Sequence, residues 1–241
     1  MTALSVLFVG LLLGMQHATE ADHLAAVATL VTRQNSLRQT VRQGLAWGVG
    51  HTLTLMLFAG VVLWFGQSIS PGWEAGLETA VGLMLIVLGA DVLRRLWRDR
   101  IHFHVHRHAS AAEHVHAHGH HRGEGAHAES PHDHAHARRW PMRALAIGMM
   151  HGLAGSAALV VLSMQAAPSV SIGLGYIALF GLGSIAGMAL LSMVIALPLR
   201  LSADYLTGLH TSMTFLVGAF SCVLGAVMVA EIGLLKSLLL N

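Results

Sequence analysis

Long apolar stretches separated by short polar segments run through the whole chain. A helix needs about 20 apolar residues to cross the hydrocarbon of a bilayer. Six stretches meet this length: residues 3–31, 43–66, 76–93, 142–166, 170–197 and 210–235. Because the alternation typical of barrel strands is absent, helices are the expected spanning element. The pattern predicts an all-α integral membrane protein with six transmembrane helices.

The composition supports this prediction. Charged residues make up only 11% of the 241 positions and the mean hydropathy is +0.63, whereas a soluble domain carries about 25% charged residues. The first stretch is expected to be a span and not a cleavable signal peptide, because it is too long and no basic residue precedes Arg33. The single cysteine, Cys222, excludes an internal disulfide and a multi-thiolate metal site.

The arginines predict the orientation in the membrane. They fall after the first stretch (Arg33, Arg38 and Arg42), between the third and fourth (residues 94–143), and after the fifth (Arg200). The alternate loops contain no Lys or Arg. The positive-inside rule then places these three loops in the cytoplasm and both termini outside the cell. The expected location of the protein is the cytoplasmic (inner) membrane.

The two halves share a pattern in the same order. Residues 14–17, "GMQH", recur as residues 148–151, "GMMH", and "WGVG" at 47–50 recurs as "FGLG" at 180–183. In the third stretch of each half, Gly82 and Gly89 match Gly218 and Gly225. An odd number of spans per half predicts two inverted three-helix repeats, residues 1–97 and 142–241. Such repeats place a substrate site near the bilayer midplane, where the halves meet.

A polar cluster interrupts the first apolar stretch in the segment "GMQHATEADHL", residues 14–24. It contains two histidines and two carboxylates: His17, Glu20, Asp22 and His23. Ionisable groups at membrane depth are costly and are usually paired or functional. On a straight helix Asp22 would point about 140° away from His17. We therefore expect the helix to be unwound or bulged here, with His51 and Thr52 of the second stretch brought close by a helical hairpin.

Imidazole and carboxylate donors without thiolate suit borderline divalent ions such as nickel, cobalt and zinc. The repeat-equivalent positions His151, Ser156 and Ser184 are expected to complete the site or to line the path to it. The alternative is that these polar residues simply pair with one another inside a helix bundle. Asp91 and Glu231 stand alone near the ends of spans, and structural pairing is expected for them.

Thirteen of the 35 residues from His102 to His136 are histidines. This loop, within residues 98–141, has too few apolar residues to bury a core and is expected to be disordered without metal. Unperturbed histidines are mostly neutral at pH 7 and available as ligands. The topology places the loop in the cytoplasm, as a weakly selective metal buffer or as a receiving area for ions.

Two motifs resemble those of the nickel/cobalt transporter (NiCoT) family. "HATEADH" resembles its His-x4-Asp-His signature, and "GVGHTLTL" its second signature, a Gly-His-Ser/Thr in the following helix. The resemblance implies metal-binding roles for His17, Asp22, His23 and His51, with Thr52 as a neighbour. The later family signature is replaced by "HGLAGSAAL". The length and six spans suggest a shorter branch similar to urease-associated nickel permeases.

The expected function is secondary transport of nickel or cobalt ions, with uptake favoured. The ion is cargo, so no cofactor is expected, and no P-loop or H-E-x-x-H motif supports an ATPase or an intramembrane metalloprotease. Proton-coupled efflux and a non-transporting membrane sensor or chaperone are the alternatives. The expected partners are the metal ion, the lipid bilayer and a cytosolic metallochaperone, without nucleic acid. The sequence leaves the oligomeric state open.

Overall fold

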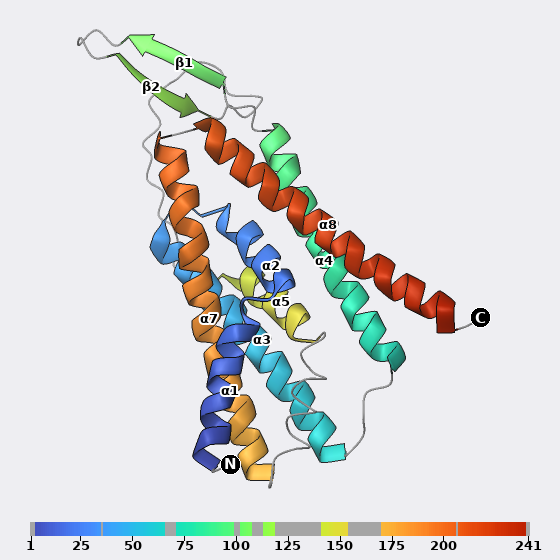
Figure 1. The fold of residues 1–241 in the computed structure, drawn as a ribbon. Helices are drawn as coiled ribbons and strands as arrows, with labels where there is room; N and C mark the ends of the chain where they lie inside the picture. The colour runs from blue at the N-terminus through green and yellow to red at the C-terminus, as the bar shows by residue number, and fades with distance from the viewer. Residues whose placement is uncertain are drawn as a thin grey trace.

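The computed structural model describes residues 3–34, 36–65, 71–98, 102–107, 113–118, 141–153, 170–205 and 207–239. Seven helices and one hairpin are formed in these ranges (Figure 1). The helices are α1 (Ala3–His17), α2 (Ala21–Val31), α3 (Leu37–Phe65), α4 (Pro71–Arg98), α5 (Met142–Gly152), α7 (Val170–Tyr205) and α8 (Thr207–Leu239). The strands are β1 (His102–Arg107) and β2 (Glu113–His118).

Three of the helices contain segments long and apolar enough to cross a membrane: residues 72–98, 171–202 and 208–233. Large apolar side chains also face outward on the long helices, including Leu57, Val87, Val194, Leu216 and Val223, each at least 60% exposed. Lipid is the solvent that such surfaces require. The chain is therefore a multi-pass membrane protein. The fourth predicted stretch, 142–166, lies partly outside the described residues, and the count of six spans stays a prediction.

The first predicted span consists of two short apolar helices. α1 ends at His17 and α2 begins at Ala21. Glu20, the N-cap residue of α2, has extended backbone angles (φ −63°, ψ 152°). The helical interruption expected at the polar cluster is therefore present.

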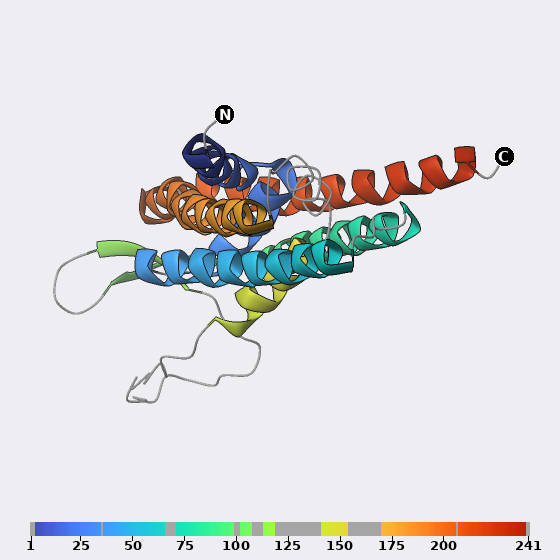
Figure 2. The ribbon, with the colours of Figure 1, turned by 90° about the horizontal axis from the view of Figure 1, so that it is seen from below.

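Packing partners are mainly far apart in the sequence. α1 packs along α7, and α3 packs against both α5 and α7. α4 and α8 run side by side along one side of the molecule (Figures 1 and 2). α2 contacts α3 only slightly, so the hairpin expected between the first two spans is not the main packing arrangement. The helices of the two halves are interleaved.

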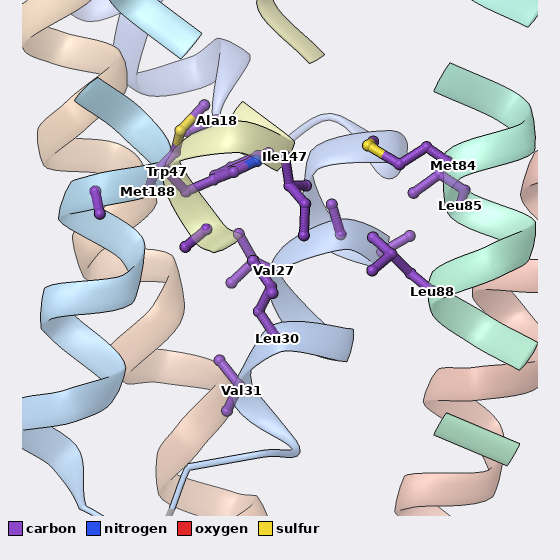
Figure 3. Close-up of a cluster of buried hydrophobic side chains, with 14 of the residues drawn as sticks. Ala18, Val27, Leu30, Val31, Trp47, Met84, Leu85, Leu88, Ile147 and Met188 are labelled. Carbon is purple, nitrogen blue, oxygen red and sulfur yellow. The ribbon is translucent and has the colours of Figure 1, made fainter. Parts of the chain in front are cut away.

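The short helix α2 forms the centre of the core. Its residues from Ala25 to Val31 are all buried, and it contacts α8, α7 and α4. Figure 3 shows Val27 and Leu30 of α2 lying between Trp47 of α3 and Leu88 of α4. A helix that is apolar on all sides is normally an interior helix. This burial holds the first turn of α2, which carries Asp22 and His23, in a fixed place.

Asp91 on α4 is paired, as expected from its isolated position. Arg33, which follows α2, donates a hydrogen bond to Asp91 Oδ2. The same oxygen lies 3.4 Å from Arg95 Nε and 3.8 Å from Arg143 Nη2 at the start of α5. One carboxylate thus connects the ends of three helices. No ion pair of Glu231 is found among the described residues.

Within the histidine-rich segment, residues 102–107 and 113–118 form two strands, and the expectation of disorder without metal stays a prediction. β1 and β2 form a two-stranded antiparallel ladder in which His102 pairs with His118 and Arg107 with Glu113. The hairpin stands beyond the end of the bundle at which α4 ends (Figure 1). Residues 119–140, which contain the remaining dense histidine runs, lie outside the described part of the chain.

Candidate metal centre

The break between α1 and α2 brings together side chains that a straight helix would separate. At the end of α1 the backbone N–H groups of Thr19 and Glu20 donate to the carbonyls of Gln16 and His17, three residues back. This tight turn redirects the chain before α2 begins. His17 at the end of α1 and His23 in the first turn of α2 then lie in contact, with their ring centroids 4.3 Å apart.

Four histidines form one buried cluster, which we call the imidazole cluster: His17, His23, His51 and His151. The His51 ring on α3 lies 5.3 Å from that of His17 and 5.1 Å from that of His23. The His151 ring on α5 lies 4.2 Å from that of His23. All four side chains are between 0 and 5% exposed. The sequence predicted each of them, and the structure brings all four together.

Two carboxylates orient the rings from outside. Glu20 Oε1 lies 2.9 Å from His17 Nδ1. Asp22 Oδ1 accepts from the backbone N–H and from Nδ1 of His23, at 2.8 Å each, and Asp22 Oδ2 lies 2.9 Å from His151 Nε2. Since an ionised carboxylate only accepts, these ring nitrogens carry the protons. The other nitrogen of each ring is then left with a free lone pair.

Five ring nitrogens of the cluster have no hydrogen-bond partner among the residues that the structure describes. They are Nε2 of His17, Nε2 of His23, Nδ1 of His151 and both nitrogens of His51, and all are buried. An unsatisfied buried polar atom costs roughly 1–3 kcal/mol, so a group of five calls for a ligand. One ligand atom each from His17, His23 and His51 lies within 4.8 Å of the others, and so does a second set from Asp22, His23 and His151. A cation between such atoms would satisfy them.

Two aromatic residues that the sequence analysis did not assign to the site pack against the cluster. Trp47 is fully buried, with its ring centroid 5.4 Å from that of His23 and 5.5 Å from that of His151. The Phe180 ring on α7 lies 5.3 Å from that of His17. Trp47 precedes His51 by four residues and so lies on the same face of α3. This spacing could have predicted from the sequence that Trp47 lies beside the cluster. Both rings help to keep water from the site.

Three other predicted residues do not join the cluster in the described contacts. The Thr52 hydroxyl donates to the Gly181 carbonyl at 3.1 Å, so it connects α3 with α7. Ser184 is buried on α7, and its hydroxyl lies 4.0 Å from Met188 Sδ. Ser156 lies outside the described residues. Thr52 is therefore a neighbour of the cluster through its position after His51 and not through a free hydroxyl.

The sequence is similar over almost its full length to one curated protein. It is 33% identical to the urease accessory protein UreH of Bacillus sp. (strain TB-90) over 235 residues, which are 98% of this chain and 95% of that protein. No protein-family profile matches the chain, and no solved structure matches it. The similarity includes both halves of the chain and every helix that contributes to the imidazole cluster.

Proposed function

The chain belongs to the family of the urease accessory protein UreH, and we propose that it transports a divalent transition-metal ion, nickel first, across the cytoplasmic membrane. The observation that carries the proposal is the imidazole cluster, with its unpartnered ring nitrogens inside a membrane protein. The resemblance of the two histidine motifs to those of nickel/cobalt transporters supports the choice of ion. The relation to a urease accessory protein, together with the resemblance to urease-associated nickel permeases, favours nickel over cobalt.

The ligand set that we propose consists of His17, His23 and His51. Nickel, cobalt and zinc accept imidazole nitrogen readily. Metal-bound histidines usually donate their other N–H to a carboxylate, which fixes the ring and makes the ligand nitrogen more basic. Glu20 and Asp22 stand in that relation to His17 and His23. We therefore assign the carboxylates to orienting the ligands, in place of the direct ligand role that the sequence analysis considered.

The close contacts between the halves support the proposal of inverted repeats. A Cβ atom on Gly14 would lie 1.9 Å from the carbonyl oxygen of Phe180, and one on Gly148 would lie 2.1 Å from that of Trp47. Gly14 corresponds to Gly148 in the internal repeat, and Trp47 corresponds to Phe180. The two contacts are therefore exchanged by the repeat, which is what a two-fold relation between the halves requires.

The third helix of each half repeats this relation. A Cβ atom on Gly89 would lie 2.5 Å from the carbonyl oxygen of Gly218, and one on Gly225 would lie 2.4 Å from that of Gly82. Gly82 matches Gly218 in the repeat, and Gly89 matches Gly225. Both contacts join α4 to α8. The repeat therefore converts the contact between Gly89 and Gly218 into the contact between Gly225 and Gly82. In an inverted repeat the two halves can tilt relative to each other and expose a central site to each side in turn.

The direction that we propose is uptake, with the ion leaving toward the histidine-rich side in the cytoplasm. A charge that enters a negative-inside cell gains about 2.3 kcal/mol per 100 mV, and a dication gains about twice that. Uptake can therefore run on the membrane potential alone. Efflux would need coupling to protons, and it is the alternative outcome of the experiment that follows.

The test is nickel flux into liposomes that contain the purified protein and enclose a nickel-sensitive dye. We expect entry when a potential negative inside is imposed, and loss of entry in the His17→Ala and His23→Ala proteins. His210→Ala is the matched control, because His210 also lies in a long apolar helix but bonds to the Leu199 carbonyl, away from the cluster. Entry that requires an opposing proton gradient would establish efflux instead. Unchanged entry in His17→Ala would refute the site.

A further inference from the structure

Three arginine side chains converge on one carboxylate at the place where α2, α4 and α5 meet. Arg33, which follows α2, donates a hydrogen bond to Asp91 Oδ2 on α4. Arg95, one turn further along α4, places its Nε 3.4 Å from the same oxygen, and Arg143 at the start of α5 places its Nη2 3.8 Å from it. We call Arg33, Arg95 and Arg143 together with Asp91 the arginine cluster.

The arginine cluster carries more positive charge than its carboxylate can balance. Guanidinium groups stay charged in proteins, so three positive charges face one negative charge among the described residues. The separation of 3.8 Å between Arg143 and Asp91 is too long for a hydrogen bond. Arg95 Nε is buried and has no hydrogen-bond partner in the described part of the chain. The arrangement leaves positive charge and N–H groups for a second anion.

The start of α5 adds to this positive field. Its first turn contains no acidic residue, and its N-cap residue, Pro141, makes no side-chain cap. The N-terminus of a helix carries a partial positive charge and favours a nearby anion. Arg143 is the second residue of α5 and brings a further positive charge to this end. A cation there is unfavourable by itself, and an anion bound beside it would offset the repulsion.

Two exposed tryptophans indicate the depth of the arginine cluster in a bilayer. Trp73 in the first turn of α4 and Trp97 in its last turn are 74% and 83% exposed. At 1.5 Å per residue they are about 36 Å apart along the helix, which exceeds the hydrocarbon thickness of about 30 Å. Tryptophan is enriched at the two interfaces of a membrane. Arg95 precedes Trp97 by two residues, so the cluster lies at about the depth of the lipid headgroups.

We propose that the arginine cluster binds the phosphate group of an anionic phospholipid between α2, α4 and α5. Arginine pairs with phosphate oxygens through two parallel N–H bonds, and basic pockets between transmembrane helices bind anionic headgroups. A zwitterionic headgroup carries a cation of its own, so it gains less from the excess of positive charge.

The bound phosphate would connect the two halves of the chain. It would join Arg143 in the second half to Arg33 and Arg95 in the first. α2 and α5, whose ends meet here, also carry His23 and His151 of the imidazole cluster. The lipid would therefore stabilise the folded arrangement of these two helices. This inference rests on the arginine cluster and does not depend on metal transport.

The experiment measures thermal unfolding of the full chain in detergent micelles, without nickel, at increasing mole fractions of phosphatidylglycerol. A lipid that binds the folded protein raises its Tm as the lipid concentration increases. We expect phosphatidylglycerol to raise Tm, and we expect no rise with equal mole fractions of phosphatidylcholine or with inorganic phosphate in the buffer. Arg143→Gln removes one positive charge of the cluster without breaking a hydrogen bond to Asp91. The mole fraction that gives an equal rise in Tm should be about fivefold higher, since one arginine near an anionic lipid contributes about that factor.

The matched control is Arg38→Gln, which removes the same charge from an exposed arginine in the first turn of α3, outside the cluster. We expect the control to need the same mole fraction as the parent chain. The same response in Arg143→Gln and Arg38→Gln would overturn the proposal, and so would the absence of a rise with phosphatidylglycerol in the parent chain. An equal rise with phosphatidylcholine, or with inorganic phosphate alone, would also overturn it. Because nickel is absent from this measurement, its outcome leaves the transport proposal to be tested separately.

Discussion

His51 offers the sharpest test of whether the imidazole cluster exists to bind an ion. Its ring is fully buried and neither nitrogen has a partner among the described residues. A histidine kept for structural reasons would have its ring nitrogens hydrogen-bonded, as buried polar groups almost always are. Replacing His51 with leucine, which has a similar volume, removes both unsatisfied atoms. We predict that His51→Leu stabilises the metal-free protein while it removes metal binding.

The expected gain follows from the two ring nitrogens. A neutral imidazole carries one donor and one acceptor, and each costs roughly 1–3 kcal/mol when buried without a partner. Volume-conserving replacements in a core usually cost less than about 1.5 kcal/mol. The net stabilisation is therefore about 0.5–6 kcal/mol. For a chain of this size each kcal/mol corresponds to roughly 2–4 °C in Tm.

Thermal unfolding in detergent, with and without nickel, measures both effects. The parent protein should gain stability with nickel, by about 2.7 kcal/mol when the ion is at one hundred times its Kd. His51→Leu should have the higher Tm without nickel and no shift with it. The control is His210→Leu, which removes a hydrogen bond to the Leu199 carbonyl and should lower Tm while the nickel shift is retained.

A lower Tm for His51→Leu without nickel, together with a retained nickel shift, would refute the reasoning. It would mean that the His51 ring is already satisfied in the metal-free protein. The imidazole cluster would then be a structural feature of the helix bundle, and the ligand assignment would have to be given up.

Three further predictions test the surroundings of the site. Gly148→Ala should destabilise the protein by about 1–3 kcal/mol and weaken nickel binding, because the new Cβ would press on the Trp47 carbonyl; Gly76→Ala, which meets nothing within 4 Å, should stabilise by about 0.5–1 kcal/mol, and calorimetry compares them. Asp22→Asn should lower nickel affinity roughly 10–100-fold in equilibrium dialysis, and equal affinity would exclude the orienting role. Asp91→Asn should cost about 1 kcal/mol in thermal unfolding, with nickel affinity unchanged, since its ion pairs are partly exposed.

The sequence predicted the cluster's four histidines because local physics marks them. Polar groups inside an apolar stretch are expensive, so the segment from His17 to His23 stood out without any knowledge of packing. The helical break followed from angles on a straight helix, which leave Asp22 pointing away from His17. His151 was found through the internal repeat. These signals depend only on positions along the chain.

Other features of the site depend on packing between distant segments, which spacing does not reveal. The sequence suggested that α1 and α3 form a hairpin, but α1 packs on α7, and α3 packs on α5 and α7. Thr52 was expected close to the metal beside His51, yet its hydroxyl donates to the Gly181 carbonyl. Trp47 belonged only to the repeated "WGVG" pattern in the sequence analysis. Its contact with two cluster rings arises only when α2 and α5 meet over α3.

The position of Asp22 connects metal binding with the arrangement of the halves. One of its oxygens accepts from His23, a proposed ligand in the first half, and the other is bonded to His151 in the second half. If the halves tilt as proposed, the distance from Asp22 to His151 changes while that to His23, its neighbour in sequence, is kept. The charge that supports the His23 ring would then differ between the two arrangements, and with it the affinity for the ion. A transporter needs this difference, because an ion can shift the balance between two states only by its difference in affinity for them.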